Sequence, residues 1–271
     1  MTAATRSDAA LSSPRGPGAR LASFIGHDLI RQLKMVESVF FIAVLPTALF
    51  LMFGALAEWG DAQVGNGNMV AHTMLSMALY GAVTATTAIA GSAAVERQLG
   101  WGRQLSLTAL SGTAYMLGKA MVAVCVAVLP VALIYAVGAA TGAELDGAWR
   151  WAASAGLTLL AAVPFAFYGL AAALLFRSEA AVGAASGMLV VFSFLGNLFM
   201  PLNGLLLDIG RFTPLYGPGV LARWPMMEGK VVATDGSVTT DPLWAAVLSV
   251  TVWTLVFLGI CLLANRRRTS R

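Results

Sequence analysis

The chain has 271 residues, of which 58% are apolar and only 11% are charged, with a formal net charge of +4. A soluble globular domain carries about 25% charged residues, so this composition excludes an ordinary soluble protein and indicates an integral membrane protein. The positive charge does not favour nucleic-acid binding, because the Lys and Arg residues are spread along the chain instead of gathering on one face.

The chain begins with two segments of different character. Residues 1–20 are rich in Ala, Ser, Pro and Gly with scattered Arg, which predicts a disordered cytoplasmic tail. In residues 21–38, apolar residues beginning with Leu21 and Phe24 recur at helical spacing, while Arg31 and other polar residues occupy the opposite side. This pattern predicts an amphipathic interfacial helix at the membrane surface. A helix that packs on a partner protein is the alternative.

Six stretches are apolar enough to cross a bilayer, since a span needs roughly 20 residues. None has Asp, Glu, Lys or Arg in its interior. The one charged residue within the six stretches, Lys119, is assigned to the cytoplasmic end of the third stretch. Lipid satisfies no backbone polar group, so all six are predicted to be helices of an all-α membrane protein. The stretches are 39–57, 69–94, 114–139, 151–176, 180–200 and 243–264.

The distribution of basic residues predicts the orientation of these spans. With both termini in the cytoplasm, thirteen Lys and Arg residues lie inside and four lie outside, as the positive-inside rule requires. The basic tail 265–271 adds to the inside charge. The outside residues are Arg150, Arg211, Arg223 and Lys230, and the inside residues are Arg6, Arg15, Arg20, Arg31, Lys34, Arg97, Arg103, Lys119, Arg177, Arg266, Arg267, Arg268 and Arg271.

Two small features of the spans have ordinary explanations. Cys125 and Cys261 both lie in predicted spans and are expected to be packing residues, not members of an extracellular disulfide framework. The run Ala55-Leu56-Ala57 resembles a signal-peptidase site, but the apolar stretch before it is longer than the usual signal core of about 7–15 residues. We therefore expect the first span to be retained.

Three features of the later chain bear on packing and on a transport pathway. Span 69–94 is comparatively polar, and its Ser and Thr residues either face other helices or bond back to their own helix. Gly183 and Gly187 have the spacing that lets two helices approach closely, either within the chain or in a dimer. The outside segment 201–242 is apolar and interrupted by prolines, so it is predicted to be re-entrant, dipping into the outer leaflet.

Catalytic and metal-binding patterns are missing from the sequence. The two histidines, His27 and His72, are far apart, and no HExxH, CxxC or intramembrane carboxylate pair is present. The stretch from Gly112 to Lys119 has the wrong glycine spacing for a phosphate-binding loop, and Ala120 stands where Ser or Thr would bind magnesium. No catalytic residue, resident cofactor or metal site is therefore expected in this chain.

The inside loop 95–112 carries the most informative pattern. It reads Glu96-Arg97-Gln98-Leu99-Gly100-Trp101-Gly102-Arg103-Gln104-Leu105-Ser106-Leu107-Thr108-Ala109, followed later by Gly118-Lys119. This order resembles the loop between the second and third spans of type-2 ATP-binding-cassette (ABC) permeases of the daunorubicin-resistance-like family. Ala109 departs from the family pattern, which usually has proline there. Met200-Pro201 and the run from Phe212 to Tyr216 also resemble the family's segment before its last span.

The resemblance implies that residues 39–264 form a six-helix permease domain and that loop 95–112 couples it to a separate ATPase subunit. Glu96 and Arg97 would then make charge-assisted contacts with that subunit. Leu99, Trp101 and Leu105 would supply an apolar anchor beside Gly100. For Trp101 an aromatic anchor at the lipid headgroups stays an equal alternative. For Glu96 and Arg97 the alternative is a solvated pair worth less than about 1 kcal/mol.

The expected function is therefore the membrane subunit of an exporter, which is not itself an enzyme. Two permeases, identical or homologous, would assemble with two ATPase subunits that bind ATP and magnesium, and spans two and five with segment 201–225 would form the pathway and its outer gate. The cargo would be amphiphilic: a drug, a lipid or a lipid-linked glycan. Two alternatives stay open: a secondary transporter coupled to an ion gradient, and a membrane scaffold or sensor.

Overall fold

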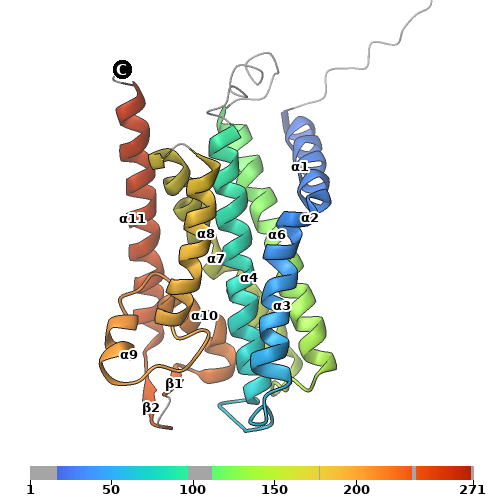
Figure 1. Cartoon of the computed structure of the whole chain (residues 1–271), viewed down its shortest axis with the longest axis vertical. Helices are drawn as coiled ribbons and strands as arrows, with labels where there is room; N and C mark the ends of the chain where they lie inside the picture. The colour runs from blue at the N-terminus through green and yellow to red at the C-terminus, as the bar shows by residue number, and fades with distance from the viewer. Residues whose placement is uncertain (1–16, 97–111, 177, 234–235, 270–271) are drawn as a thin grey trace, which may run out of the picture.

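The computed structural model describes residues 17–96, 112–176, 178–233 and 236–269. Within these ranges the chain is a helical bundle with one small β-hairpin (Figure 1). Its elements are α1 (Pro17–Lys34), α2 (Val36–Val39), the π-helical η1 (Phe40–Val44), α3 (Leu45–Phe50), the π-helical η2 (Leu51–Ala55), α4 (Met69–Glu96), α6 (Gly112–Ala140), α7 (Ala148–Phe176), α8 (Glu179–Leu195), α9 (Gly204–Gly210), α10 (Tyr216–Met227), β1 (Lys230–Val232), β2 (Val238–Thr240) and α11 (Leu243–Thr269).

Five described helical stretches are long and apolar enough to cross a membrane. Four of them are α4, the Gly118–Ala140 part of α6, α7, and the Leu243–Ala264 part of α11, and the fifth runs from Val36 to Ala55 through α2, η1, α3 and η2. All five coincide with predicted stretches. The remaining predicted stretch, 180–200, contains α8, an apolar helix of 17 residues.

The central helix of the bundle is α4. In its most apolar window 89% of the residues are buried, against 17% for the window of α11. Gly169 of α7 explains the close contact between α4 and α7, because a Cβ there would lie 2.1 Å from the carbonyl oxygen of Thr87. The hydroxyl groups of Thr86 and Thr87 donate to the α7 carbonyls of Ala162 and Phe165.

The other Ser and Thr hydroxyl groups of α4 bond back to their own helix, the second of the two predicted arrangements. Thr73, Ser76, Thr84 and Ser92 each donate to a backbone carbonyl of their own helix. Such bonds satisfy polar groups within an apolar surrounding and require no aqueous pathway. The polarity of α4 is therefore compatible with its burial among other helices.

Three predicted boundaries are wrong. Helix α1 begins at Pro17, so the predicted disordered tail does not extend to residue 20, and Pro is favourable at a first helical position. The backbone leaves helical geometry at Met35, with φ −79° and ψ 86°, so 21–38 is not one continuous helix. Helix α11 continues to Thr269, so most of the predicted tail 265–271 is helical, since Arg near a helix C-terminus is favourable.

The two ends of the bundle carry different elements (Figure 1). Helix α1, the C-terminal end of α4, the beginning of α6 and the C-terminal end of α11 lie at one end. The hairpin β1–β2, α9 and α10 lie at the opposite end. The strands β1 and β2 are antiparallel, with Val231 opposite Thr239. We call these the α1 end and the hairpin end.

Candidate functional site

Four charged side chains and one tyrosine meet at the α1 end. Asp28 and Arg31 come from α1, Glu96 is the last residue of α4, and Tyr115 and Lys119 lie in the first turns of α6. Lys119 Nζ lies 3.0 Å from Asp28 Oδ2 and 2.9 Å from Glu96 Oε2. Arg31 Nη2 lies 2.6 Å from Glu96 Oε1 and 2.9 Å from Asp28 Oδ1. We call these five residues the ionic cluster.

The ionic cluster is electrically balanced and graded in exposure. The side chains of Asp28 and Lys119 are only 6% and 3% exposed, whereas those of Glu96 and Arg31 are 23% and 47% exposed. The Tyr115 hydroxyl donates to Glu96 Oε2 at 3.0 Å. Burial and the nearby Glu96 carboxylate raise the pKa of Tyr115, so this group stays a neutral donor. Burial lowers the pKa of Arg31, but its contacts with Glu96 and Asp28 outweigh burial and raise it overall.

Local packing explains why these charges meet. Gly118 leaves room for Phe24 of α1, because a Cβ at Gly118 would lie 2.8 Å from the Phe24 ring. The Phe24 and Tyr115 rings are 5.5 Å apart between centroids. Asp28 lies one helical turn after Phe24 and therefore faces α6, where Lys119 follows Gly118. The Gly118-Lys119 pair thus combines close helix contact with a buried charge partner.

A cavity of about 230 Å³ adjoins the ionic cluster. It is lined by Phe24, His27, Asp28, Arg31, Glu96, Tyr115 and Lys119. Among the residues that the structure describes, no group of three or more His, Cys, Asp or Glu is arranged to hold a metal ion. The ion pairs of the cluster attach α1 electrostatically to the ends of α4 and α6.

The ionic cluster was not predicted from the sequence. Glu96 was predicted to contact an ATPase subunit, and in the structure its carboxylate contacts Arg31, Lys119 and Tyr115 of this chain. Lys119, which was assigned to the cytoplasmic end of the third predicted span, is buried, and the role of Asp28 was missed. The spacing of Asp28 one turn after Phe24 is the signal that could have indicated it. The remaining predicted coupling residues, Arg97, Leu99, Gly100, Trp101 and Leu105, lie outside the described residues.

The predicted glycine pair lies on an open face of α8. No heavy atom outside the local helix lies within 4 Å of a Cβ built at Gly183 or Gly187. On the same helix Met188, Val191 and Phe194 are 46%, 48% and 45% exposed. Within the described part of the chain, therefore, the glycine pair does not serve intrachain packing.

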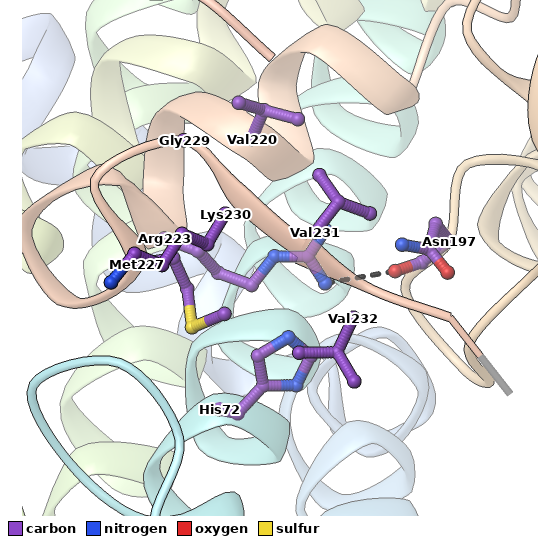
Figure 2. Close-up of a pocket in the computed structure, with 9 residues that line it drawn as sticks. All are labelled: His72, Asn197, Val220, Arg223, Met227, Gly229, Lys230, Val231 and Val232. Carbon is purple, nitrogen blue, oxygen red and sulfur yellow. Dashed lines mark hydrogen bonds between the residues drawn. The ribbon is translucent and has the colours of Figure 1, made fainter. Parts of the chain in front are cut away.

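Arg223 of α10 bonds to α4 and to the segment that follows α8; Figure 2 shows its bond to Asn197. Its residue exposure is only 4%. Its Nη1 donates to Ser76 Oγ of α4 at 3.1 Å and to the carbonyl oxygen of Asn197, just after α8, at 2.8 Å. Asn197 has a positive φ of 58°, which ends the helical path after α8. Burial lowers the pKa of Arg223 to about 10, so its guanidinium remains charged at neutral pH.

No family model matches this chain, and a search of curated proteins finds no similar relative. The fold itself defines the class of protein. The chain is a mostly helical, multi-pass membrane protein with five described helical stretches able to span a bilayer.

Proposed function

We propose that this chain is the permease subunit of an ABC exporter, which moves an amphiphilic substrate outward across the cytoplasmic membrane. In this proposal a separate ATPase subunit hydrolyses ATP, and the α1 end is cytoplasmic. The observation that carries the proposal is the attachment of α1 to Glu96 and Lys119 by the ionic cluster. A surface helix and two membrane helices are thereby joined where loop 95–112, which resembles a coupling loop, leaves α4.

The ionic cluster suits mechanical transmission. Removing one partner of a buried ion pair costs about 3–5 kcal/mol, so α1, α4 and α6 resist separation under load. A force applied to the coupling loop therefore moves these helices together. Since α4 is the most buried span, its displacement disturbs contacts throughout the bundle.

The proposed topology has six spans, with α8 as the fifth. At about 1.5 Å per residue its 17 residues extend about 25 Å, somewhat less than a hydrocarbon core of about 30 Å. The following residues, Gly196 to Met200, complete the crossing. With both termini inside, α9 and α10 form the re-entrant outer segment, and exposed side chains such as Leu205 (74%) and Phe212 (81%) enter the outer leaflet.

The α8 face supports the expected permease pair. An exposed apolar face with two unobstructed glycines lets a second helix approach closely. A homodimer through α8 would place two copies of α4 and α8 around a shared pathway.

An apolar cavity supports an amphiphilic cargo. It has a volume of about 480 Å³ and lies between α7, α8 and α11, with Tyr168, Leu175, Met188 and Phe257 among its lining residues. Small-molecule sites commonly occupy about 300–1,000 Å³. Because no charged side chain lines this cavity among the described residues, it suits the apolar part of a cargo that enters from the membrane.

The coupling assignment is tested by coexpressing this chain with a candidate ABC ATPase subunit, such as a P-loop protein encoded by a neighbouring gene. Arg97→Ala with Trp101→Ala should abolish copurification with that ATPase and ATP-driven export of a fluorescent amphiphile, without lowering the melting temperature. Glu96→Ala with Arg97→Ala should lose both coupling and stability, because Glu96 also holds Arg31 and Lys119. Glu179→Gln, a charge change on the neighbouring inside turn, is the control. Unchanged export in both double variants would contradict the coupling assignment.

A further inference from the structure

The sequence contains two Asn-Gly pairs, Asn66-Gly67 and Asn203-Gly204. Asparagine followed by glycine is prone to spontaneous deamidation, in which the backbone nitrogen of the glycine attacks the side-chain Cγ of the asparagine. Glycine favours the attack because it has no Cβ to obstruct its own nitrogen. In a folded protein the attack also depends on how freely the two residues move. The two pairs of this chain differ in that respect.

The pair Asn203-Gly204 is loosely held at the beginning of α9. Both residues are exposed, and the Asn203 side chain forms no capping hydrogen bond to the first turn of α9. No heavy atom outside the neighbouring residues and the local helix lies within 4 Å of a Cβ built at Gly204. The Asn203 carbonyl accepts a long bond of 3.3 Å from the backbone nitrogen of Leu207. Rotation about ψ of Asn203, which is 164°, therefore displaces only this weak contact.

The pair Asn66-Gly67 is held firmly by contacts with distant parts of the chain. The Asn66 Nδ2 donates to the carbonyl oxygen of Met226 and to Glu228 Oε1, both at 3.0 Å. The Asn66 backbone nitrogen donates to the same Met226 carbonyl at 2.9 Å, and the Asn66 carbonyl accepts from the backbone nitrogen of Asp146 at 3.0 Å. Attack on the Asn66 side chain would require these bonds to break, so the fold protects this pair.

Water, which completes the reaction, has access to the beginning of α9. Asp208 lies four positions after Gly204, on the same face of the helix, and its side chain is 65% exposed. Burial of an ionised carboxylate in hydrocarbon is costly, so this face of α9 contacts water. The exposed apolar side chains of α9, Leu205 and Ile209, lie on a different face.

We propose that Asn203 is a site of spontaneous deamidation in the folded chain. The Gly204 nitrogen bonds to Cγ of Asn203, and the side-chain nitrogen leaves as ammonia with the proton of the Gly204 nitrogen. The resulting succinimide ring is opened by a water molecule at either of its carbonyl groups, which gives aspartate or isoaspartate. Both products place a negative charge directly before α9, and isoaspartate also lengthens the backbone there by a methylene group.

The test follows both pairs in one sample of the purified full chain. The chain is incubated in detergent at mildly alkaline pH in water labelled with heavy oxygen and is then digested in ordinary water, so that only products formed during the incubation carry the label. Mass spectrometry of the peptides gives the reaction rate at each asparagine. In the folded chain Asn203 should react about tenfold faster than Asn66 or more, because reaction at Asn66 must break two side-chain hydrogen bonds. In denatured chain the two rates should converge.

Three results would overturn the proposal: equal rates in the folded chain, label at Asn203 only after denaturation, or a ratio of rates that denaturation leaves unchanged. Asn203→Gln keeps the amide on a longer side chain, which would have to form a larger ring, so the label should disappear from that peptide. Label that persists in this variant would place the reaction at another residue and would also overturn the proposal. Glu228→Ala removes an acceptor of Asn66 and should raise the rate at Asn66 alone, and an unchanged rate there would contradict the protection by the fold.

Discussion

Replacing Lys119 with Met tests the strength of the ionic cluster directly. The substitution leaves Asp28, whose side chain is 6% exposed, with Arg31 as its only described ion-pair partner. Removing one partner of a buried pair costs about 3–5 kcal/mol. Because half-exposed Arg31 remains 2.9 Å from Asp28, we expect a loss near the lower limit, about 3 kcal/mol.

The matched comparison is the double variant Asp28→Leu with Lys119→Met, which removes both charges. Replacing a buried ion pair with apolar residues of similar volume is often neutral, so this variant should melt close to the unaltered chain. Glu228→Gln removes the charge of an ion-pair partner that is 58% exposed and keeps a side-chain oxygen for Arg150 and Asn66, and should cost less than about 1 kcal/mol. Melting in detergent is followed by tryptophan fluorescence. Equal melting temperatures for the single and double variants would refute the buried-pair reasoning.

Three further predictions concern packing, ionisation and association. Gly169→Ala should destabilise the bundle by about 1–3 kcal/mol, because its Cβ would lie 2.1 Å from the Thr87 carbonyl oxygen. The control is Gly156→Ala in the same helix, whose Cβ would meet no atom within 4 Å. Equal melting temperatures for the two variants would contradict the close contact of α4 and α7. Burial and hydrogen bonding to Asp241 raise the pKa of Tyr216, and burial and Glu96 raise the pKa of Tyr115, so replacing both tyrosines with Phe should not change the tyrosinate absorbance of the folded chain near pH 11. Because both folded pKa values exceed the unfolded value of about 10, the stabilising effect of the two tyrosines is complete below pH 10 and is lost as the pH rises through the folded values. A reduced tyrosinate absorbance in the double variant would contradict this environment. Gly183→Leu with Gly187→Leu should weaken chemical crosslinking of two copies in the membrane, whereas Gly259→Leu, at another open glycine, should not; unchanged crosslinking would exclude α8 as the interface.

The spans were predictable because lipid imposes a simple requirement on sequence. The predicted stretch 69–94 and the helix Met69–Glu96 agree closely, since apolar length and backbone hydrogen bonding determine both. The break at Met35 was not predictable, because the apolar pattern continues across it while the backbone changes direction. Periodicity reports which side of a helix is apolar and does not report where a helix bends.

The buried charges depend on contacts between distant segments. Asp28 and Lys119 are 91 positions apart, and Ser76 and Arg223 are 147 apart, so neither pair has a local pattern. Glu96 was singled out for another role, contact with an ATPase subunit, because it belongs to a contiguous loop that resembles a known family. Arg223 was counted only as an outside charge, since no sequence signal indicates that α10 is covered by β1 and α4.

The most direct test of the central claim is export from sealed vesicles that contain the chain and the proposed ATPase subunit. If the ATPase delivers energy through the α1 end, inside-out vesicles should take up a fluorescent amphiphile when ATP is added. They should take up none when the P-loop lysine of the ATPase is replaced. Uptake driven by a pH or sodium difference in vesicles without nucleotide would contradict the proposed mechanism.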